Sequence, residues 1–185
     1  MVSIKNKLTL QEFLALPPDE LNYEFVDGYA VPKVSPKYFH STLQFALCFL
    51  LRNWCKGKRR VVPEWAIILK RQGEDWVPTP DLTCISYARL PANWKRNEAC
   101  PIAPELVIEI ISLGQTKRQF LYKAKDYFEA GVSRVWIVDP EAISIQVFDA
   151  IDSSHLYKDS TAITDALLPG LELTVEGIFA EAGLI

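Results

Sequence analysis

The chain has 185 residues, of which 49% are hydrophobic and 11% aromatic, and its formal net charge is −3. This length suits one domain with a sizeable core, and the apolar content excludes an intrinsically disordered chain. A weakly acidic balance gives no general attraction for polyanions, so a nucleic-acid partner would need a local basic surface.

The spacing of the cysteines and the absence of a long apolar run narrow the class of protein further. Cys48, Cys55, Cys84 and Cys100 form no Cys-x-x-Cys pair and have no nearby set of histidines, so structural zinc and a disulfide framework are not expected. No signal-peptide pattern opens the chain, and no apolar run is long enough to span a bilayer. We therefore expect a cytoplasmic protein with no membrane partner.

The N-terminal part is predicted to form a short helix, a hairpin and a long helix. A capping-box pattern over residues 9–12 opens the short helix. Asp27-Gly28 lies between two short β-prone runs, which is a strong hairpin signal. A long helical pattern follows Pro36 and places several apolar residues on one face, namely Phe39, Leu43, Leu47, Leu50 and Trp54.

The middle of the chain is predicted to contain strands separated by turns and one long loop. A strand is expected over 61–69, a turn at 72–75, and a second strand over 79–85 that opens with Pro80-Asp81. Residues 86–100 are predicted to be a loop. The densest basic cluster precedes the first of these strands and is a weak candidate for contacting nucleic acid: Lys58, Arg59 and Arg60.

Residues 103–112 are a run of branched apolar residues that contains two carboxylates, Glu105 and Glu109. Bounded by Pro104 and Gly114, the run predicts a strand buried on both faces in the middle of a sheet. A buried carboxylate costs several kcal/mol unless it has a cation or hydrogen-bond donors. Glu109 therefore requires a partner, whereas Glu105, at the start of the strand, is expected to be exposed.

The C-terminal part begins with a charged amphipathic helix over 115–130 that Gly131 ends. A buried strand over 135–138 is expected to pair with a strand over 143–148. One more strand is predicted near 156–157, and a short helix begins at Val175 or Glu176 and ends at Ala180.

The order of elements predicts an α/β (α+β) fold, a mixed β-sheet with helices on its faces. We expect a single domain over 1–185. Within it, the N-terminal helix and hairpin would occupy 9–33, the core roughly 36–149, and the C-terminal strands and short helix 150–185.

Asp81, Glu109 and the helix after Glu109 form the candidate chemical site. Asp81 heads one strand and Glu109 lies in the next, so pairing of these strands would bring the two carboxylates together. Paired carboxylates with backbone carbonyls are the oxygen ligands that Mg²⁺ prefers. The helix must pack back over the sheet and carries Lys123, with Lys125 as the alternative if the helix register shifts. Two carboxylates, a divalent cation and an ammonium together can hydrolyse a phosphodiester.

The ordered motifs resemble the Uma-type family of restriction-endonuclease-like proteins, which belongs to the PD-(D/E)XK nuclease superfamily. The resemblance covers roughly residues 10–179. It rests on these motifs: Tyr23 to Gly28, His40, Pro80-Asp81, Pro104 to Ser112, Lys123 to Tyr127, Gly131-Val132 and Trp136 to Pro140. It implies a restriction-endonuclease-like fold and Mg²⁺-dependent (or Mn²⁺-dependent) cleavage of DNA, with a homodimer as one expectation.

The resemblance also implies roles for individual residues. Asp81 would be the first metal ligand and Glu109 the second acid, with the Ile110 carbonyl as a further candidate ligand. The superfamily's lysine normally stands two residues after the second acid, at a position that is isoleucine in this chain. In the Uma-type branch the lysine belongs to the following helix, at the position of Lys123. Glu24 would match an acidic residue from the N-terminal region.

Three positions depart from the family pattern. Leu113 stands where proline is usual, Tyr29 replaces an acidic residue after the hairpin glycine, and Gln119 replaces an acidic residue one turn before the helix lysine. None of these changes removes an implied metal ligand. Gln119, in place of an acidic residue, changes the balance of charge around the helix lysine.

Each candidate also has a purely structural interpretation. Asp81 could be a turn residue at a strand start, and Glu109 could form an ion pair with Lys123 without any metal. His40 could be a site residue or a hydrogen-bonded packing residue. The alternatives to a DNA endonuclease are a non-catalytic DNA- or protein-binding domain with the nuclease fold, and a phosphodiesterase for small substrates.

Overall fold

The structure is a computed structural model that describes residues 6–17 and 22–185. Its centre is a six-stranded sheet with the strand order β10-β9-β8-β7-β6-β3. Within this sheet β7 and β8 are parallel and the other neighbouring strands are antiparallel. The strands are β3 (Arg59–Pro63), β6 (Leu82–Ser86), β7 (Leu106–Ile110), β8 (Arg134–Asp139), β9 (Ser144–Ala150) and β10 (Ser153–Tyr157).

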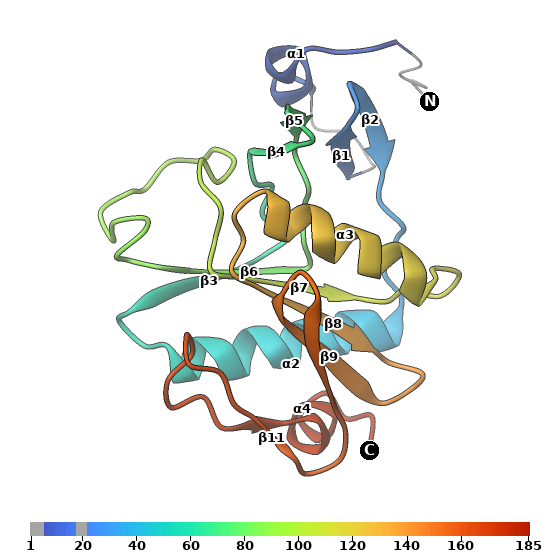
Figure 1. The fold of residues 1–185 in the computed structure, drawn as a ribbon, viewed down its shortest axis with the longest axis vertical. Coiled ribbons are helices and arrows are strands. Elements are labelled where there is room, and N and C mark those ends of the chain that lie inside the picture. The colour runs from blue at the N-terminus through green and yellow to red at the C-terminus, as the bar shows by residue number, and fades with distance from the viewer. Residues whose placement is uncertain (1–5, 18–21) are drawn as a thin grey trace.

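Helices cover both faces of the sheet (Figure 1). Helix α3 (Lys117–Glu129) connects the parallel strands β7 and β8 and lies on one face. Helices α2 (Tyr38–Trp54) and α4 (Val175–Glu181) lie on the other face. The predicted mixed sheet flanked by helices is therefore confirmed.

The alternation of side chains along β7 decides where the candidate acid points. Leu106, Ile108 and Ile110 belong to the hydrophobic core beneath α2 and α4, whereas Val107 belongs to the core beneath α3. Because successive strand residues point to opposite faces, Glu109 shares the α3 side with Val107. All five residues of β7 are buried, as the apolar run predicts.

Short helices and strands extend the fold at the top of Figure 1, and others lie near the C-terminus of the chain. The predicted capping box between Thr9 and Glu12 opens α1. The predicted hairpin is also present, and Asp27 and Gly28 take φ values of 53° and 86°, as a two-residue hairpin turn requires. These elements are α1 (Leu10–Leu14), β1 (Tyr23–Val26), β2 (Tyr29–Pro32), β4 (Leu69–Arg71), β5 (Glu74–Trp76), β11 (Ala162–Ile163) and β12 (Leu173–Thr174).

The prediction of one strand over 61–69 is wrong. β3 ends at Pro63, which has no N–H to donate to a sheet, and Glu64 takes a left-handed φ of 49°. The chain turns there, and Ile67 forms an isolated bridge with Cys100 before β4 begins. This turn brings Glu64 toward the start of β6, where its backbone N–H donates to the Asp81 carbonyl.

Two predictions about exposure are also wrong. Glu105 is only 8% exposed, because its carboxylate accepts the Ser86 backbone N–H at 2.9 Å and lies 3.7 Å from the Arg89 guanidinium. In α2, Phe39 is 54% exposed although the apolar pattern placed it with the core residues. The buried stripe of this helix is His40, Leu43, Ala46, Leu47 and Leu51.

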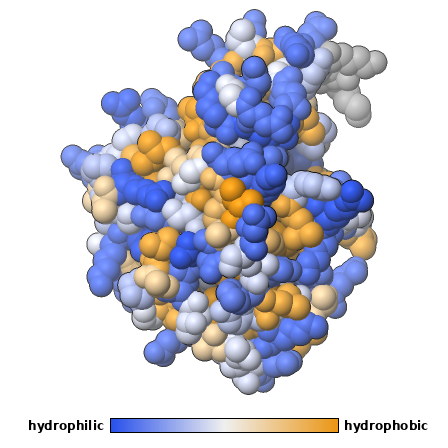
Figure 2. Space-filling view, in the orientation of Figure 1, coloured by the Kyte–Doolittle hydropathy of each residue, from blue (hydrophilic) through white to orange (hydrophobic). Residues whose placement is uncertain are grey.

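The face of the molecule in Figure 2 is mainly hydrophilic, with hydrophobic side chains gathered in small patches. Across residues 6–17 and 22–185, no helix combines the length and the apolar character that a membrane span requires. The four cysteines are free thiols, and Cys55, Cys84 and Cys100 are buried.

Candidate active site

A pocket of about 310 Å³ at the carboxyl end of β7 brings most of the candidate residues together. β6 and β7 are neighbours, with Leu82 opposite Ile108. The same register, carried one residue further, sets Asp81 across from Glu109. The polar residues that line the pocket are Glu24, Lys33, His40, Asp81, Glu109, Ser112, Gln115, Gln119 and Lys123.

Asp81 is 3% exposed and is held by donors on both of its oxygens. Its Oδ2 accepts the Ile110 backbone N–H at 2.6 Å and lies 3.1 Å from His40 Nε2, while its Oδ1 lies 3.3 Å from Lys33 Nζ. Burial alone would raise the pKa of Asp81. The contacts with His40, Lys33 and the Ile110 N–H outweigh burial and hold this pKa below its usual value.

Glu109 is also 3% exposed but has fewer compensating contacts. Its Oε1 accepts the Tyr127 hydroxyl at 2.6 Å and lies 2.9 Å from Lys123 Nζ. Burial raises the pKa of Glu109 to about 7, although the Lys123 ammonium lowers it, and the Asp81 carboxylate raises it further. The pocket lining includes three carboxylates, Glu24, Asp81 and Glu109, and two lysines, Lys33 and Lys123, and this balance favours an additional cation.

Lys123 contacts two carboxylates, one from β1 and one from β7. Its Nζ is 2.8 Å from Glu24 Oε1 and 2.9 Å from Glu109 Oε1. Burial disfavours the charged form and would lower the pKa of Lys123. The carboxylates of Glu109 and Glu24 outweigh this effect and raise the pKa. The alternative lysine, Lys125, is 58% exposed and its Nζ lies 3.8 Å from Glu129. The structure thus brings Lys123 and Glu24 into the pocket and leaves Lys125 on the outer surface of α3.

Lys33, which follows β2, is a pocket residue that was not predicted from the sequence. Its Nζ lies 2.6 Å from Glu64 Oε2, 2.7 Å from the Thr79 carbonyl oxygen and 3.3 Å from Asp81 Oδ1. Burial lowers the pKa of Lys33, but Asp81 and the other nearby carboxylates outweigh this effect and raise it. No sequence spacing connects Lys33 with Asp81, so only the folded chain reveals the contact.

Gln44 and Tyr127 are two further site residues that were not predicted from the sequence. Gln44 Nε2 donates to Glu64 Oε1 at 2.8 Å and to the Asp81 carbonyl at 2.9 Å. Helical spacing offered a signal for both, because Gln44 is four residues after His40 and Tyr127 is four residues after Lys123.

Gln119, a departure from the family pattern, has a structural role at the start of α3. Its Oε1 accepts the Thr116 backbone N–H at 2.8 Å and the Thr116 hydroxyl at 3.0 Å. An amide at this position satisfies the first turn of the helix as a glutamate would. The helix that carries Lys123 therefore keeps its N-terminal cap without adding a charge to the pocket.

The donor chemistry of the pocket fits Mg²⁺ or Mn²⁺. Asp81 and Glu109 supply two carboxylates, and the Ile110 carbonyl points to the Asp81 side because the N–H and C=O of a strand residue face the same neighbour. Within the described part of the chain, no three or more His, Cys, Asp or Glu side chains are grouped to hold a metal ion. Mg²⁺ retains several waters and commonly uses one or two carboxylates plus substrate phosphates, so this set suffices.

The basic cluster proposed from the sequence lies away from this pocket. Arg59 pairs with Ser86 at one end of the β3–β6 pair, whereas Asp81 precedes the other end. Arg59 Nη2 donates to the Leu167 carbonyl at 2.8 Å, and Arg60 donates to carbonyl groups of the loop that follows β6. These arginines are engaged within the fold, and Lys58 is exposed.

A family model identifies the family of this chain, and a solved structure shares its fold. A family model named Uma2 and described as "Putative restriction endonuclease" matches residues 10–176. A crystal structure described as a putative nuclease belonging to DUF820, from Anabaena variabilis ATCC 29413, aligns with a TM-score of 0.81 and 22% sequence identity, covering 95% of this chain and 99% of that chain. No curated protein matches the chain. The resemblance to the Uma-type family and the fold class expected from the sequence are confirmed, and the chain belongs to the Uma2 family of putative restriction endonucleases.

Proposed function

We propose that the protein is a divalent-metal-dependent endonuclease that hydrolyses phosphodiester bonds in DNA. The observation that carries this proposal is that two buried carboxylates, Asp81 and Glu109, line one pocket, with the Lys123 ammonium 2.9 Å from the second acid. Asp81, Glu109 and the Ile110 carbonyl would hold Mg²⁺ or Mn²⁺, which supplies Lewis-acid activation of a phosphate and of an attacking water.

The residues around the two acids set their orientation. The Ile110 N–H and His40 fix Asp81, and the Tyr127 hydroxyl fixes one oxygen of Glu109. Orientation matters because a catalytic constellation loses much of its rate when its members are misplaced by about 1 Å. His40 is accordingly proposed as a positioning residue for Asp81.

Lys123 is proposed to stabilise negative charge on the phosphate and to orient the attacking water. Its raised pKa keeps the amine protonated at neutral pH, so it is a poor acceptor for a proton from water. A fixed ammonium beside the reacting phosphate stabilises charge that develops in the transition state. Glu24, 2.8 Å from Nζ, is a second carboxylate that holds the ammonium in place.

The proposal is tested by incubating the full chain with supercoiled plasmid DNA and, separately, with a small model phosphodiester. Nicked or linear plasmid should form with Mg²⁺ or Mn²⁺ and not with EDTA, and Asp81→Asn should abolish the reaction. Asp75→Asn is the matched control, because Asp75 is 34% exposed and pairs with Lys70 at 2.6 Å on the β4–β5 hairpin.

Full activity of Asp81→Asn would contradict the proposed role of this residue. Metal binding without cleavage of either substrate would instead favour a non-catalytic DNA- or protein-binding domain. Hydrolysis of the model compound alone would favour a small-substrate phosphodiesterase. A homodimer and a cytoplasmic location remain predictions from the sequence.

A further inference from the structure

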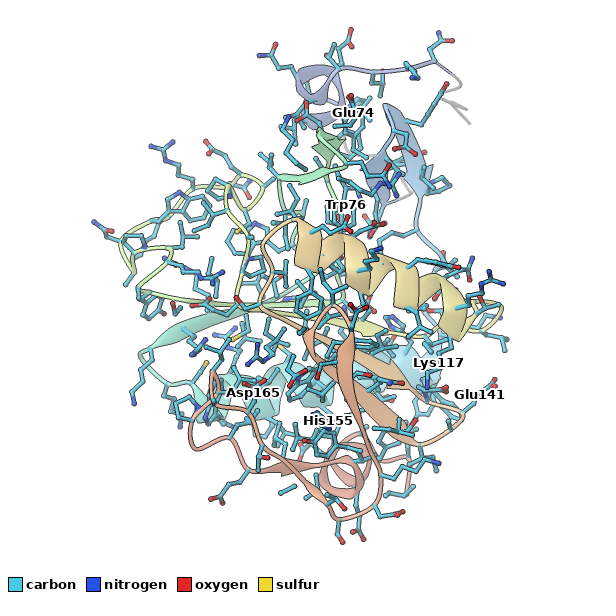
Figure 3. The ribbon with its side chains drawn as sticks, in the orientation of Figure 1. Glu74, Trp76, Lys117, Glu141, His155 and Asp165 are labelled. Atoms are coloured by element: carbon cyan, nitrogen blue, oxygen red, sulfur yellow. The ribbon has the colours of Figure 1, made fainter. Side chains whose placement is uncertain are left out.

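A larger groove lies beside the catalytic pocket, and the mechanism above does not use it. Its volume is about 650 Å³. The start of α2, the β7–α3 connection and the β8–β9 turn line it, and these segments meet at the right-hand edge of Figure 1. Figure 3 labels Lys117 and Glu141 at this edge. The groove and the catalytic pocket share three lining residues: His40, Ser112 and Gln115. One extended ligand can therefore occupy both the groove and the pocket.

Large hydrophobic side chains are exposed along the groove. Tyr38, Phe39 and Leu113 are 66%, 54% and 66% exposed. The rings of Tyr38 and Phe39 have centroids 5.9 Å apart and are tilted by 56°, so they present two differently oriented faces. Exposed apolar residues gathered beside a polar pocket indicate a binding surface, and exposed rings are platforms on which nucleic-acid bases stack.

Two lysines line the groove together with these rings. Lys37 and Lys117 line the groove, and both side chains are exposed. Lys37 caps α2 and Lys117 begins α3, so the N-terminal ends of two long helices lie beside the groove. The first-turn N–H groups of a helix favour anions such as phosphate.

The groove also has two acidic residues, Asp139 and Glu141, which come from the end of β8 and the β8–β9 turn. Asp139 Oδ1 accepts the backbone N–H groups of Glu141 and Ala142 at 3.1 and 3.0 Å and thereby stabilises the β8–β9 turn. Glu141 is exposed and comes from that turn. The carboxylates thus belong to the β8–β9 side, whereas the aromatic rings and lysines come from the α2 and α3 sides.

One buried polar atom near the groove has no partner. His40 is 6% exposed and directs Nε2 to Asp81, and among the described residues its Nδ1 has no hydrogen-bond partner. A buried polar group without a partner carries a free-energy penalty. Nδ1 is itself buried, so the contact that His40 makes where the groove meets the pocket is the one from Nε2 to Asp81.

We propose that this aromatic groove (Lys37, Tyr38, Phe39, Leu113 and Lys117) binds an unpaired nucleotide next to the phosphate that is cleaved. The enzyme would then act on single-stranded or locally opened DNA. This inference rests on the proposed nuclease function and names its substrate class.

The choice of an unpaired strand follows from the chemistry of the groove. Base faces in a duplex are covered by their neighbours, so a base can stack on Tyr38 or Phe39 only after it leaves the duplex. Binding to a duplex depends mainly on many phosphate contacts, but the chain has a net charge of −3 and the groove offers two lysines. Stacking on rings would supply the affinity that this small number of cations does not.

The test measures binding separately from cleavage. Full-length Asp81→Asn is titrated, in EDTA, into a fluorescent single-stranded oligonucleotide and into the duplex of the same sequence, and anisotropy is recorded. We expect tighter binding to the single strand. Adding Tyr38→Ala and Phe39→Ala should weaken single-strand binding by roughly tenfold or more, with little change for the duplex.

The chain offers a matched control and a separate electrostatic readout. Phe45→Ala, on the same helix, removes a ring that is 72% exposed but does not line the groove, so it should leave binding unchanged. Replacing Lys37 and Lys117 with alanine should reduce the slope of log affinity against log salt by about 0.7 for each phosphate that a lysine no longer neutralises. Circular dichroism shows whether each variant is folded, and Tyr38→Ala alone serves as the test if the double variant is not.

Equal or tighter binding to the duplex would overturn the proposal, as would unchanged single-strand binding in the aromatic variants. A wild-type chain that binds the single strand as expected but never cleaves it would contradict the proposed function and support the groove. Cleavage that the aromatic substitutions do not affect, on single strand and duplex alike, would contradict the groove and leave the nuclease function intact.

Discussion

The carboxylate of Asp81 accepts the backbone N–H of Ile110 at 2.6 Å. The first acid is therefore fastened to the residue that directly follows the second acid, Glu109. This bond joins the start of β6 to the end of β7, so the positions of both acids depend on one strand register. A slip of one residue in β7 would turn Glu109 toward α2 and away from Lys123.

The position of Lys123 predicts different effects for two neighbouring lysines. Lys123→Ala should lower the rate of metal-dependent plasmid cleavage by roughly a hundredfold or more, because it removes the ammonium between Glu24 and Glu109. Lys125→Ala should leave the rate within about twofold, since Lys125 is 58% exposed and contacts Glu129 on the same helix. The reverse ranking in a cleavage assay would show that the assignment of the helix lysine is wrong.

The contact between Lys33 and Asp81 predicts an effect of Lys33 on metal affinity rather than on the chemical step. Its ammonium lies 3.3 Å from Asp81 Oδ1 and repels any divalent cation at that carboxylate. Lys33→Met should therefore tighten Mn²⁺ binding by about tenfold, as measured by isothermal titration calorimetry. Lys70→Met, at a lysine that is 65% exposed, is the control and should change nothing. Weaker Mn²⁺ binding in Lys33→Met would mean that Lys33 instead holds Asp81 in its binding orientation.

The raised pKa of Glu109 predicts that the stability of the wild-type protein depends on pH. Its pKa rises from 4.5 to about 7 on folding because the carboxyl is buried. Between these values the folded state binds more protons than the unfolded state, so the free energy of unfolding falls as pH rises through this window. The loss amounts to about 3 kcal/mol at most.

Glutamine at this position does not titrate and escapes that loss. Relative to wild type, Glu109→Gln should therefore be more stable at about pH 8 than at about pH 5 by up to the same amount. Urea denaturation of both proteins in EDTA measures the difference. A stability difference that is the same at both pH values would show that the buried carboxyl is not the titrating group.

Local chemistry accounts for the parts of the fold that the sequence predicted well. The capping box at Thr9 and the left-handed turn at Asp27-Gly28 depend on residues within a few positions of each other. The burial of β7 follows from its apolar run, which only Glu109 interrupts. The helix pattern alone left Lys123 and Lys125 as alternatives, and the resemblance to the Uma-type family singled out Lys123, which the structure brings into the pocket.

Long-range contacts explain what the sequence did not reveal. Glu105 is buried because Ser86 and Arg89, from another part of the chain, provide its donors. Phe39 is exposed because the packing of α2 buries His40 instead. Lys33 reaches Asp81 only after the chain has folded between β2 and α2. None of these relationships has a periodic pattern in the sequence.

The proposed function requires that Asp81 and Glu109 hold a divalent cation. Crystals of the wild-type protein soaked in Mn²⁺ should show an anomalous peak between these two carboxylates, at roughly 2.0–2.2 Å from their nearest oxygens as for a small octahedral cation. Crystals of Asp81→Asn treated in the same way should lack it. A wild-type structure with Lys33 and Lys123 unmoved and no anomalous peak between Asp81 and Glu109, at Mn²⁺ concentrations that support cleavage, would contradict metal binding at these two acids.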